Sequence, residues 1–395
     1  MRRFVRVGLL LELGRAYGRR LCEGVSSVAL ARGWELVSLS LADVQRDDAR
    51  VDALIARVYD ERVANALKAL GKPCVDVFGT VRGTGFSIVD ADHAAIGRLA
   101  SEHFLEHRFS TFAYCGYDGV MFSDLRRDSF VQRLACSHFD CICYKTSDAA
   151  RRDFMTNVLR NERLRMGPDD KQMLAWVRKL PKPVAVFCSH DLRAYQLAQT
   201  CRRIGIDVPR EVAILGADDD VIFCSFSSPM LSSVDPDAFG VGRAAAETLA
   251  KLLENPSARP FQLTVPPKGV VMRPSTETYP LDPPWLSEAL VYINRNVGAN
   301  ITSADVGRHL GMSHTPIDRA FRTVLGTSVQ KEIVRARLSF AEHLLKATSQ
   351  SVGEIASRVG FTRLEYFCTS FRARYGVTPS VYRACPVSGP ARREN

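Results

Sequence analysis

Apolar positions along the chain follow two different patterns. Up to about residue 275, short apolar runs alternate with amphipathic segments in which apolar residues recur every three or four positions. The short runs predict buried strands, and the amphipathic segments predict helices. The predicted strands are residues 5–11, 34–41, 53–56, 73–78, 109–115, 139–144, 185–188 and 213–215, and the predicted helices are residues 15–32, 64–70, 124–137 and 171–179.

Strands and helices that alternate along a chain build a parallel sheet covered by helices on both faces. Here the alternation comes in two rounds, and the second begins near residue 109. We therefore predict a bilobed α/β domain over residues 1–275, with one parallel sheet in each lobe. Because open parallel sheets bind ligands at the carboxyl ends of their strands, we expect a ligand between the lobes.

After residue 285 the apolar spacing is helical throughout, and one pattern occurs twice. Each copy predicts a short helix, a glycine turn and a second helix that ends at a glycine. The copies run from Ser303 to Gly326 and from Ser351 to Gly376, and a long helix over 329–347 joins them. This is the layout of a helix-turn-helix, whose second helix lies in the DNA major groove.

Local chemistry supports these predicted helix ends. Ser351 with Glu354, and Thr362 with Glu365, have the hydroxyl-then-carboxylate spacing of a capping box. Four glycines stand where the chain must turn or where a left-handed C-cap is needed: Gly311, Gly360, Gly326 and Gly376.

Three residues of the predicted second helices have roles set by helix geometry. Phe321 and Phe371 have the spacing of core residues. Pro316 is compatible with its helix only if the helix begins at about residues 313–315, where a missing N–H costs nothing.

Proline is concentrated between the two patterns. Eight prolines lie within residues 255–284, a density that marks a domain boundary or a stiff connection. Residues 261–265 and 270–272 are predicted to pair as short edge strands. We predict a linker at 276–284, a helical domain at 285–385 that opens with a helix over 285–297, and a disordered tail at 386–395.

The positive charge is concentrated in the helical part. The net charge is +10 in all. From residue 281 onward there are 15 Lys or Arg and 9 Asp or Glu, a balance of +6 in 115 residues, against +4 in the other 280. Contact with nucleic-acid phosphates would require such an excess.

Cysteine usage and hydropathy exclude several classes of protein. Eleven cysteines without even spacing, and without a Cys-x-x-Cys pair, argue against a disulfide framework and against a zinc finger. We expect no metal or other cofactor and a reducing cytoplasm. The apolar run at 5–11 is interrupted by Arg6 and is too short for a signal peptide. No run approaches ~20 apolar residues, so no membrane contact is expected.

The second copy of the repeat carries a characteristic set of residues. These are Ile355-Ala356, Gly360-Phe361, Phe371-Arg372, Gly376, Pro379 and Tyr382-Arg383. With the repeat itself, they make this part similar to the arabinose-type (AraC/XylS) family of transcription factors. In that family, two helix-turn-helix units joined by one helix bind DNA.

The N-terminal domain carries a second group of informative stretches. They are Asp92, Ile96-Gly97, His103-Phe104-Leu105, Arg126 to Phe130, Val208-Pro209, Gly216 to Asp219 and Leu231 to Val234. Through them this domain resembles the sugar-binding domains of the lactose-repressor (LacI/GalR) family. Those repressors carry a helix-turn-helix ahead of that domain, whereas this sequence begins at the first predicted strand.

The combination of these two parts resembles the xylose operon regulators. The resemblance implies a DNA-binding transcription regulator rather than an enzyme. It implies an activator of the catabolism of a pentose such as D-xylose, which would bind between the lobes. It further implies a homodimer that binds double-stranded promoter DNA and contacts RNA polymerase.

Candidate sugar ligands follow from chemistry and from the resemblance. Carboxylates accept from two hydroxyls, and arginine donates to neighbouring oxygens. Asp218 follows a predicted strand, and its counterpart in the lactose-type domains binds sugar. Arg126 matches a ligand-binding arginine of that family, and His190 stands where the family usually has asparagine. The candidate ligand-binding residues are Asp218, Arg126, His190, Asp235 and Arg15.

Candidate DNA contacts lie near the start of each predicted second helix, where side chains meet base edges. In the first copy they are His314, Thr315, Asp318 and Arg319; Arg319 suits guanine, since a guanidinium matches O6 and N7 together. In the second copy they are Arg363, Tyr366 and Thr369. Arg322 and Arg372 are expected on phosphates.

Three alternatives remain open at this point. DNA-repair alkyl acceptors join a reactive cysteine to an arabinose-type domain, although no cysteine here has a Pro-Cys-His-like setting. A transport-type binding protein is disfavoured by the DNA-binding half. The third alternative is a regulator that responds to a different sugar or to a non-sugar ligand.

Overall fold

The computed structural model describes residues 4–46, 50–154, 170–255 and 257–384. The chain divides into two compact units, residues 1–276 and residues 277–395, here called the N-terminal and C-terminal units. In the described ranges, no helix is long and apolar enough to cross a membrane.

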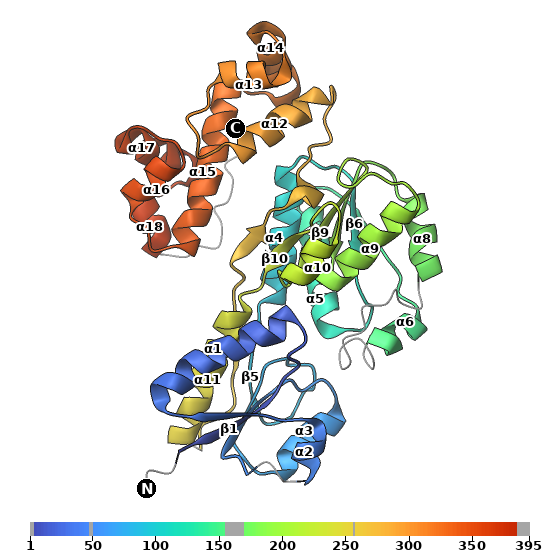
Figure 1. The fold of residues 1–395 in the computed structure, drawn as a ribbon, viewed down its shortest axis with the longest axis vertical. Helices are drawn as coiled ribbons and strands as arrows, with labels where there is room; N and C mark the ends of the chain where they lie inside the picture. Colours follow the sequence, from blue (N-terminus) through green and yellow to red (C-terminus); the bar gives the residue numbers. More distant parts are fainter. Residues whose placement is uncertain (1–3, 47–49, 155–169, 256, 385–395) are drawn as a thin grey trace. The chain divides into compact units, whose positions relative to one another are not determined.

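The first lobe of the N-terminal unit contains a six-stranded sheet of order β11-β5-β4-β3-β1-β2, in which every neighbouring pair is parallel (Figure 1). Its elements are β1 (Arg6–Leu10), α1 (Ala16–Arg32), β2 (Glu35–Ser38), α2 (Leu41–Arg46), β3 (Ala53–Ala56), α3 (Glu61–Ala69), β4 (Cys74–Asp76), β5 (Ser87–Ala91), α11 (Ala238–Glu254) and β11 (Gln262–Val265).

The second lobe repeats this plan with the order β12-β10-β9-β8-β6-β7, parallel except for the antiparallel pair β10–β12. Its elements are α4 (His93–Glu106), β6 (Phe112–Cys115), α5 (Met121–Ala135), β7 (Cys141–Cys143), α6 (Asp148–Asp153), α8 (Asp170–Lys179), β8 (Val184–Cys188), α9 (Asp191–Arg203), β9 (Val212–Ala217), α10 (Val221–Phe226), β10 (Ser232–Asp235) and β12 (Gly269–Val271). The predicted bilobed α/β fold is therefore confirmed, with one antiparallel edge.

Burial explains why the strands could be read from apolar runs. All residues of β3 and β9 are buried, as expected for strands covered by helices on both faces. By contrast, β11 lies at the edge of its sheet, and three of its four residues are exposed. The two short strands predicted in the proline-rich stretch are edge strands in the structure, but of different sheets: β11 pairs with β5 and β12 (Gly269–Val271) pairs with β10 (Ser232–Asp235).

Glycines allow two pairs of helices to pack closely. A Cβ at Gly24 of α1 would lie 2.0 Å from the carbonyl oxygen of Phe239, and one at Gly242 of α11 would lie 1.9 Å from that of Leu21. In the second lobe, a Cβ at Gly97 of α4 would lie 2.3 Å from the carbonyl oxygen of Arg126 in α5. Only glycine permits these approaches. The α4–α5 contact fixes the position of Arg126.

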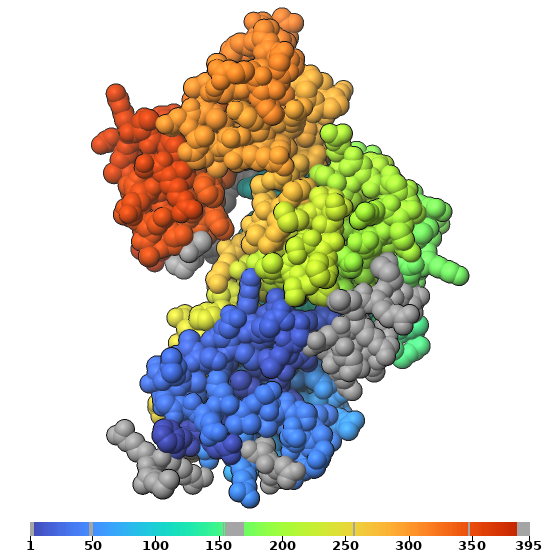
Figure 2. Space-filling model, viewed as in Figure 1, coloured from blue at the N-terminus to red at the C-terminus, as the bar shows by residue number. Residues whose placement is uncertain are grey.

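Within its described residues, the C-terminal unit has helices and no strands, and it contains the predicted pair of helix-turn-helix motifs, α13–α14 and α16–α17, joined by α15. Its helices are α12 (Trp285–Arg295), α13 (Ser303–Leu310), α14 (His314–Leu325), α15 (Val329–Ala347), α16 (Val352–Arg358), α17 (Leu364–Tyr375) and α18 (Pro379–Ala384). Each half has its own hydrophobic core against one end of α15. In the space-filling view, the halves form an orange body and a red body (Figure 2).

The helix ends confirm most of the predicted caps and correct one. Ser351 and Glu354 form the predicted capping box, and the four glycines all have positive φ. The Thr362–Glu365 box is wrong, because α17 begins at Leu364 and its N-cap is Arg363, which makes no side-chain cap. A further capping box, Thr302 with Asp305, stands at the start of α13.

The proline-rich junction contributes to the C-terminal core. Tyr279 is buried in that core, and its hydroxyl accepts from Asn294 at 2.9 Å. Glu277 pairs with Arg295 of α12. Part of the segment predicted as a linker, 276–284, thus packs onto α12. The predicted disordered tail, 386–395, lies outside the described residues.

Candidate functional site

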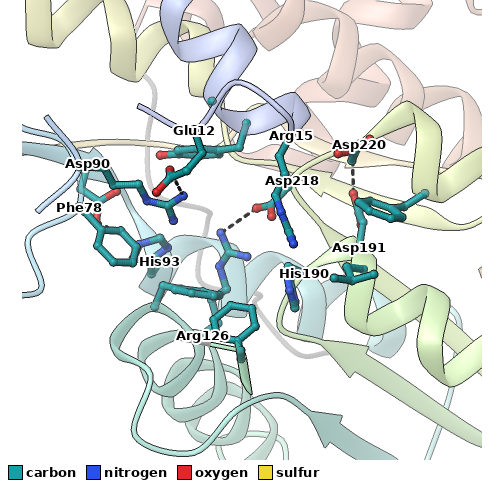
Figure 3. A pocket seen from close by; sticks show the side chains of 17 residues that line it. Glu12, Arg15, Phe78, Asp90, His93, Arg126, His190, Asp191, Asp218 and Asp220 are labelled. Atoms are coloured by element: carbon teal, nitrogen blue, oxygen red, sulfur yellow. Dashed lines mark hydrogen bonds and ion pairs between the residues drawn. The ribbon is translucent and has the colours of Figure 1, made fainter. Parts of the chain in front are cut away.

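A pocket in the N-terminal unit is lined from both lobes. Several of its residues follow the carboxyl ends of the strands that flank the point where strand order reverses, β1/β3 in one sheet and β6/β8 in the other. Ligands of open parallel sheets bind at this point. The lining residues include Glu12, Arg15, Tyr17, Arg57, Phe78 and Asp90 of the first lobe and His93, Phe122, Arg126, Phe154, His190, Asp191, Asp218 and Asp220 of the second (Figure 3).

Arg126 and Asp218 form the ion pair at the centre of this pocket. Nη2 of Arg126 lies 3.2 Å from Oδ1 of Asp218, and Nη1 donates to the carbonyl oxygen of Ser189. The Arg126 side chain is 2% exposed and that of Asp218 is 24% exposed. Burial raises the pKa of Asp218, and the neighbouring guanidinium opposes that rise. The pair brings an acceptor and a fork of donors to one point.

Two further arginines reach the pocket from the first lobe. Arg57 pairs with Glu12 at 3.1 Å, and its guanidinium lies 4.1 Å from the ring centre of Phe78. Arg15 is the N-cap of α1, and burial together with the nearby Arg57 lowers its pKa. The cations and carboxylates of the pocket thus alternate, which suits a neutral ligand with many hydroxyls.

His190 faces the same pocket in a neutral form. Burial, and then the nearby positive charges of Arg15 and Arg126, hold its pKa well below the usual value. Its Nδ1 lies 3.1 Å from the hydroxyl of Ser189. When the Ser189 hydroxyl donates to Nδ1, the neutral ring carries its proton on Nε2. Nε2 is buried and bonds to none of the described residues, so it is available as a donor.

This neutral histidine predicts a pH dependence of stability. A pKa lowered in the folded state stabilises the fold above about pH 6.5, and that stabilisation is lost as the pH falls, because only the unfolded chain then takes up the proton. We expect the wild type to lose stability relative to His190→Asn by up to about 1.4 kcal/mol per pH unit below 6.5. The free energies of unfolding of the wild type and His190→Asn, measured in urea at pH 7.5, 6.0 and 5.0, test this expectation. Parallel pH profiles for the two proteins would contradict the assignment.

The structure places four of the five candidate ligand residues in the pocket, namely Arg15, Arg126, His190 and Asp218. Asp235 lies elsewhere, in a second hollow with Arg20 and Lys268. Its strand, β10, lies beyond β9 and next to the edge strand β12, away from the point where strand order reverses.

Sequence reasoning missed several lining residues, Glu12, Arg57, Phe78, Asp90 and His93 among them. A signal was present for two of them. Arg57 follows the predicted strand 53–56 directly, and Phe78 ends the predicted strand 73–78. Side chains at strand ends are those that reach such a pocket.

The two second helices of the C-terminal unit present equivalent outer faces. α14 and α17 each have 12 residues, and they bury matching positions, Ile317, Phe321 and Leu325 in one and Phe367, Phe371 and Tyr375 in the other. Most of the candidate DNA contacts are exposed on the remaining surface: His314, Thr315, Arg319, Arg322, Arg363, Tyr366, Thr369 and Arg372.

Local bonds distinguish these candidates. Asp318 is half-buried and pairs with Arg322 at 2.8 Å on the same helix. Each of these two side chains therefore already has an ion-pair partner within the protein. The hydroxyl of Thr369 donates to the carbonyl oxygen of Glu365. Tyr366 is 56% exposed, so more than half of this side chain remains accessible to a partner. Pro316 lies in the first turn of α14, where proline is tolerated.

Comparisons with known proteins agree with this architecture. Residues 101–276 match the periplasmic binding protein-like domain family, and residues 306–384 match a helix-turn-helix domain family. The xylose operon regulatory protein of Haemophilus influenzae is 24% identical over 392 residues, which cover 96% of this chain and 98% of that protein. The protein of the same name from Escherichia coli K12 is 25% identical over 390 residues, with 96% of each chain covered.

A solved structure extends the likeness to three dimensions. The structure of xylose-binding transcription activator xylR has a TM-score of 0.61 and 25% sequence identity, and the match covers 97% of this chain and 98% of that one. Each of these three matches extends over both domains of this chain, in the same order. Over nearly its full length the chain is thus similar to the xylose operon regulatory proteins, and it carries a periplasmic binding protein-like domain followed by a helix-turn-helix domain.

Proposed function

We propose that this protein regulates genes of pentose catabolism and that D-xylose or a close relative is its effector. The polar groups left open in the pocket carry this proposal. Tyr17 Oη, Arg126 Nε and His190 Nε2 are buried and make no hydrogen bond within the described part of the chain. A polyol supplies partners for such groups, whose isolation otherwise costs free energy.

Size and shape support a small sugar. The cavity has a volume of about 50 Å³. Since one water needs about 10–15 Å³, the cavity has room for a few water-sized groups. Phe78, Phe122 and Phe154 line it and offer apolar surfaces to the C–H faces of a ring. A monosaccharide fits this description better than an oligosaccharide. Both relatives named above are xylose operon regulators.

A thermal-shift panel of pentoses and hexoses tests the effector. We expect D-xylose or another pentose to raise the melting temperature of the full-length protein, because a ligand that binds only the folded state stabilises it. A rise with a nucleoside or a peptide, and with no sugar, would refute the pentose assignment while leaving the DNA-binding function intact.

Contacts between the lobes suggest how occupancy is sensed. Oδ2 of Asp220 in the second lobe accepts from the backbone N–H of Ala16 at 3.1 Å, at the start of α1 in the first lobe. Arg20 of α1 pairs with Asp219 at 3.1 Å, and Asp219 also pairs with Arg273 at 2.7 Å, close to the end of the N-terminal unit. We propose that sugar favours this closed arrangement and that the DNA-competent state shares it.

The role of Arg20 gives a second prediction. Arg20→Gln removes a partly exposed pair between the lobes, which is worth roughly 0.5–1 kcal/mol, and we expect about two- to fivefold weaker sugar binding by calorimetry. Arg32→Gln is the matched control, because Arg32 of the same helix pairs with Glu254 of α11 within the first lobe. Equal affinities for the two variants would contradict a role in closure.

The remaining features of the proposal follow the family. We propose that the protein acts in the cytoplasm as a homodimeric activator, binds double-stranded promoter DNA and contacts RNA polymerase. The exposed residues of α14 and α17 named above would contact bases, with Arg322 and Arg372 on phosphates. It would act by binding alone, without catalysis.

A further inference from the structure

One buried arginine lies between the two helix-turn-helix motifs. α15 gives Val329 and Ile333 to the core of the first half and Leu338 and Leu344 to the core of the second. Arg337 lies between these two sets and is 9% exposed. It is therefore placed where a side chain can contact both halves.

Arg337 binds a loop of the first half. Its Nη2 donates to the carbonyl oxygen of Ala299 at 3.1 Å and to that of Ile301 at 3.4 Å. Both residues lie in the connection that leads from α12 into α13, the first helix of motif one. This connection is thereby attached to the middle of α15.

The same guanidinium lies against the turn of the second motif. Gly360, between α16 and α17, has a φ of +85°, and a Cβ there would lie 2.9 Å from Nε and 3.1 Å from Cζ of Arg337. Nearby, a Cβ at Gly298 would lie 3.1 Å from the carbonyl oxygen of Arg358, in the last turn of α16. The loop 298–301, Arg337 and the turn 358–360 form one contact cluster, which we call the Arg337 bridge.

Burying the charge of Arg337 costs free energy that an apolar side chain would not. Among the described residues, no carboxylate pairs with Arg337, and its Nε has no hydrogen-bond partner. A well-packed apolar side chain often replaces a buried charge without loss of stability. A directional contact to two carbonyl groups and to a glycine turn is something that an apolar side chain cannot supply.

We propose that the Arg337 bridge holds the recognition helices α14 and α17 at one fixed separation, so that the protein accepts a single spacing between the two base sets it reads. Arg337 is in this sense a positioning residue that touches no base. The inference rests on the proposed function in which both helices contact the same duplex, with successive major-groove faces roughly 34 Å apart.

Selection from a random-sequence DNA library tests the proposal. The full-length wild type, Arg337→Met and Arg337→Lys are each used, with and without D-xylose, and the bound sequences are read out. For the wild type we expect two short motifs at one spacing. For Arg337→Met we expect the same two motifs at several spacings, and at least about tenfold weaker binding to the wild-type optimum. Arg337→Lys, which keeps a charge and a donor, restores the single spacing in part.

Lys346→Met is the matched control, since it removes one positive charge from the same helix, where Lys346 pairs with Glu342 within the second half. It should keep the wild-type spacing. An Arg337→Met protein with one unchanged spacing would overturn the proposal, and so would unfolding of both Arg337 variants, which would assign the residue to stability alone. A wild type that selects only one short motif would instead overturn the two-helix binding mode.

Discussion

Arg126→Met is expected to weaken sugar binding strongly. The Arg126 side chain is 2% exposed, and its loss leaves Asp218 without its ion-pair partner and the carbonyl oxygen of Ser189 without this donor. Breaking a buried pair from one side costs about 3–5 kcal/mol. We therefore expect a lower melting temperature. We also expect sugar binding to weaken by about 10- to 100-fold or more, because a hydrogen bond that involves a charged group contributes about 1.5–3 kcal/mol.

Arg127→Met is the control for this experiment. Arg127 is the next residue of α5, but its guanidinium pairs with Asp118, Asp124 and Asp128 outside the pocket. Calorimetry and thermal melting with D-xylose distinguish the two variants. If Arg126→Met bound sugar as tightly as Arg127→Met, the pocket would not be the effector site.

Phe371→Ala is expected to unfold the second helix-turn-helix motif. Phe371 is fully buried, and its ring centre lies 4.4 Å from that of Tyr375, 5.5 Å from that of Tyr382 and 5.7 Å from that of Phe367. Removing a buried phenylalanine costs about 3–5 kcal/mol, which is large beside the stability of a small domain. Circular dichroism should show a lower melting temperature of the helical part, and promoter binding should be lost.

Tyr366→Ala is the reciprocal control on the same helix. Because Tyr366 is mostly exposed, its removal should change stability by less than about 0.5 kcal/mol. On the proposed function it should nonetheless weaken binding to DNA. A Tyr366 variant that bound promoter DNA like the wild type would remove this residue from the interface, without bearing on the core assignment of Phe371.

Most of the secondary structure could be predicted because it depends on neighbours along the chain. Ala53 to Ala56 are apolar without alternation because helices cover both faces of their sheet. The repeated glycines mark the same turns in both motifs because only glycine adopts a positive φ without strain. The Thr362–Glu365 box failed because a hydroxyl and a carboxylate three residues apart form a box only if the hydroxyl residue is the N-cap, and the N-cap of α17 is the next residue, Arg363.

The binding site was only partly predictable, since it depends on strand order. Asp218 and Arg126 could be singled out from local motifs, and they meet because α4 and α5 pack closely at Gly97. Asp235 and Arg57 both lie at or just after the end of a strand, yet only Arg57 lines the pocket, because β3 borders the point where strand order reverses, whereas β10 lies two strands away from it, next to the edge strand β12.

The amino-acid sequence by itself determined the two-part architecture, the repeated motif and the type of residue at each helix face, because these follow from periodicity and local backbone preference. Only the tertiary structure decided which charges share the pocket and that Arg337 connects the two motifs. Partners such as Arg57 and Glu12, or Arg337 and Ala299, are about 40 residues apart, and no local pattern encodes a contact that closes so long a loop.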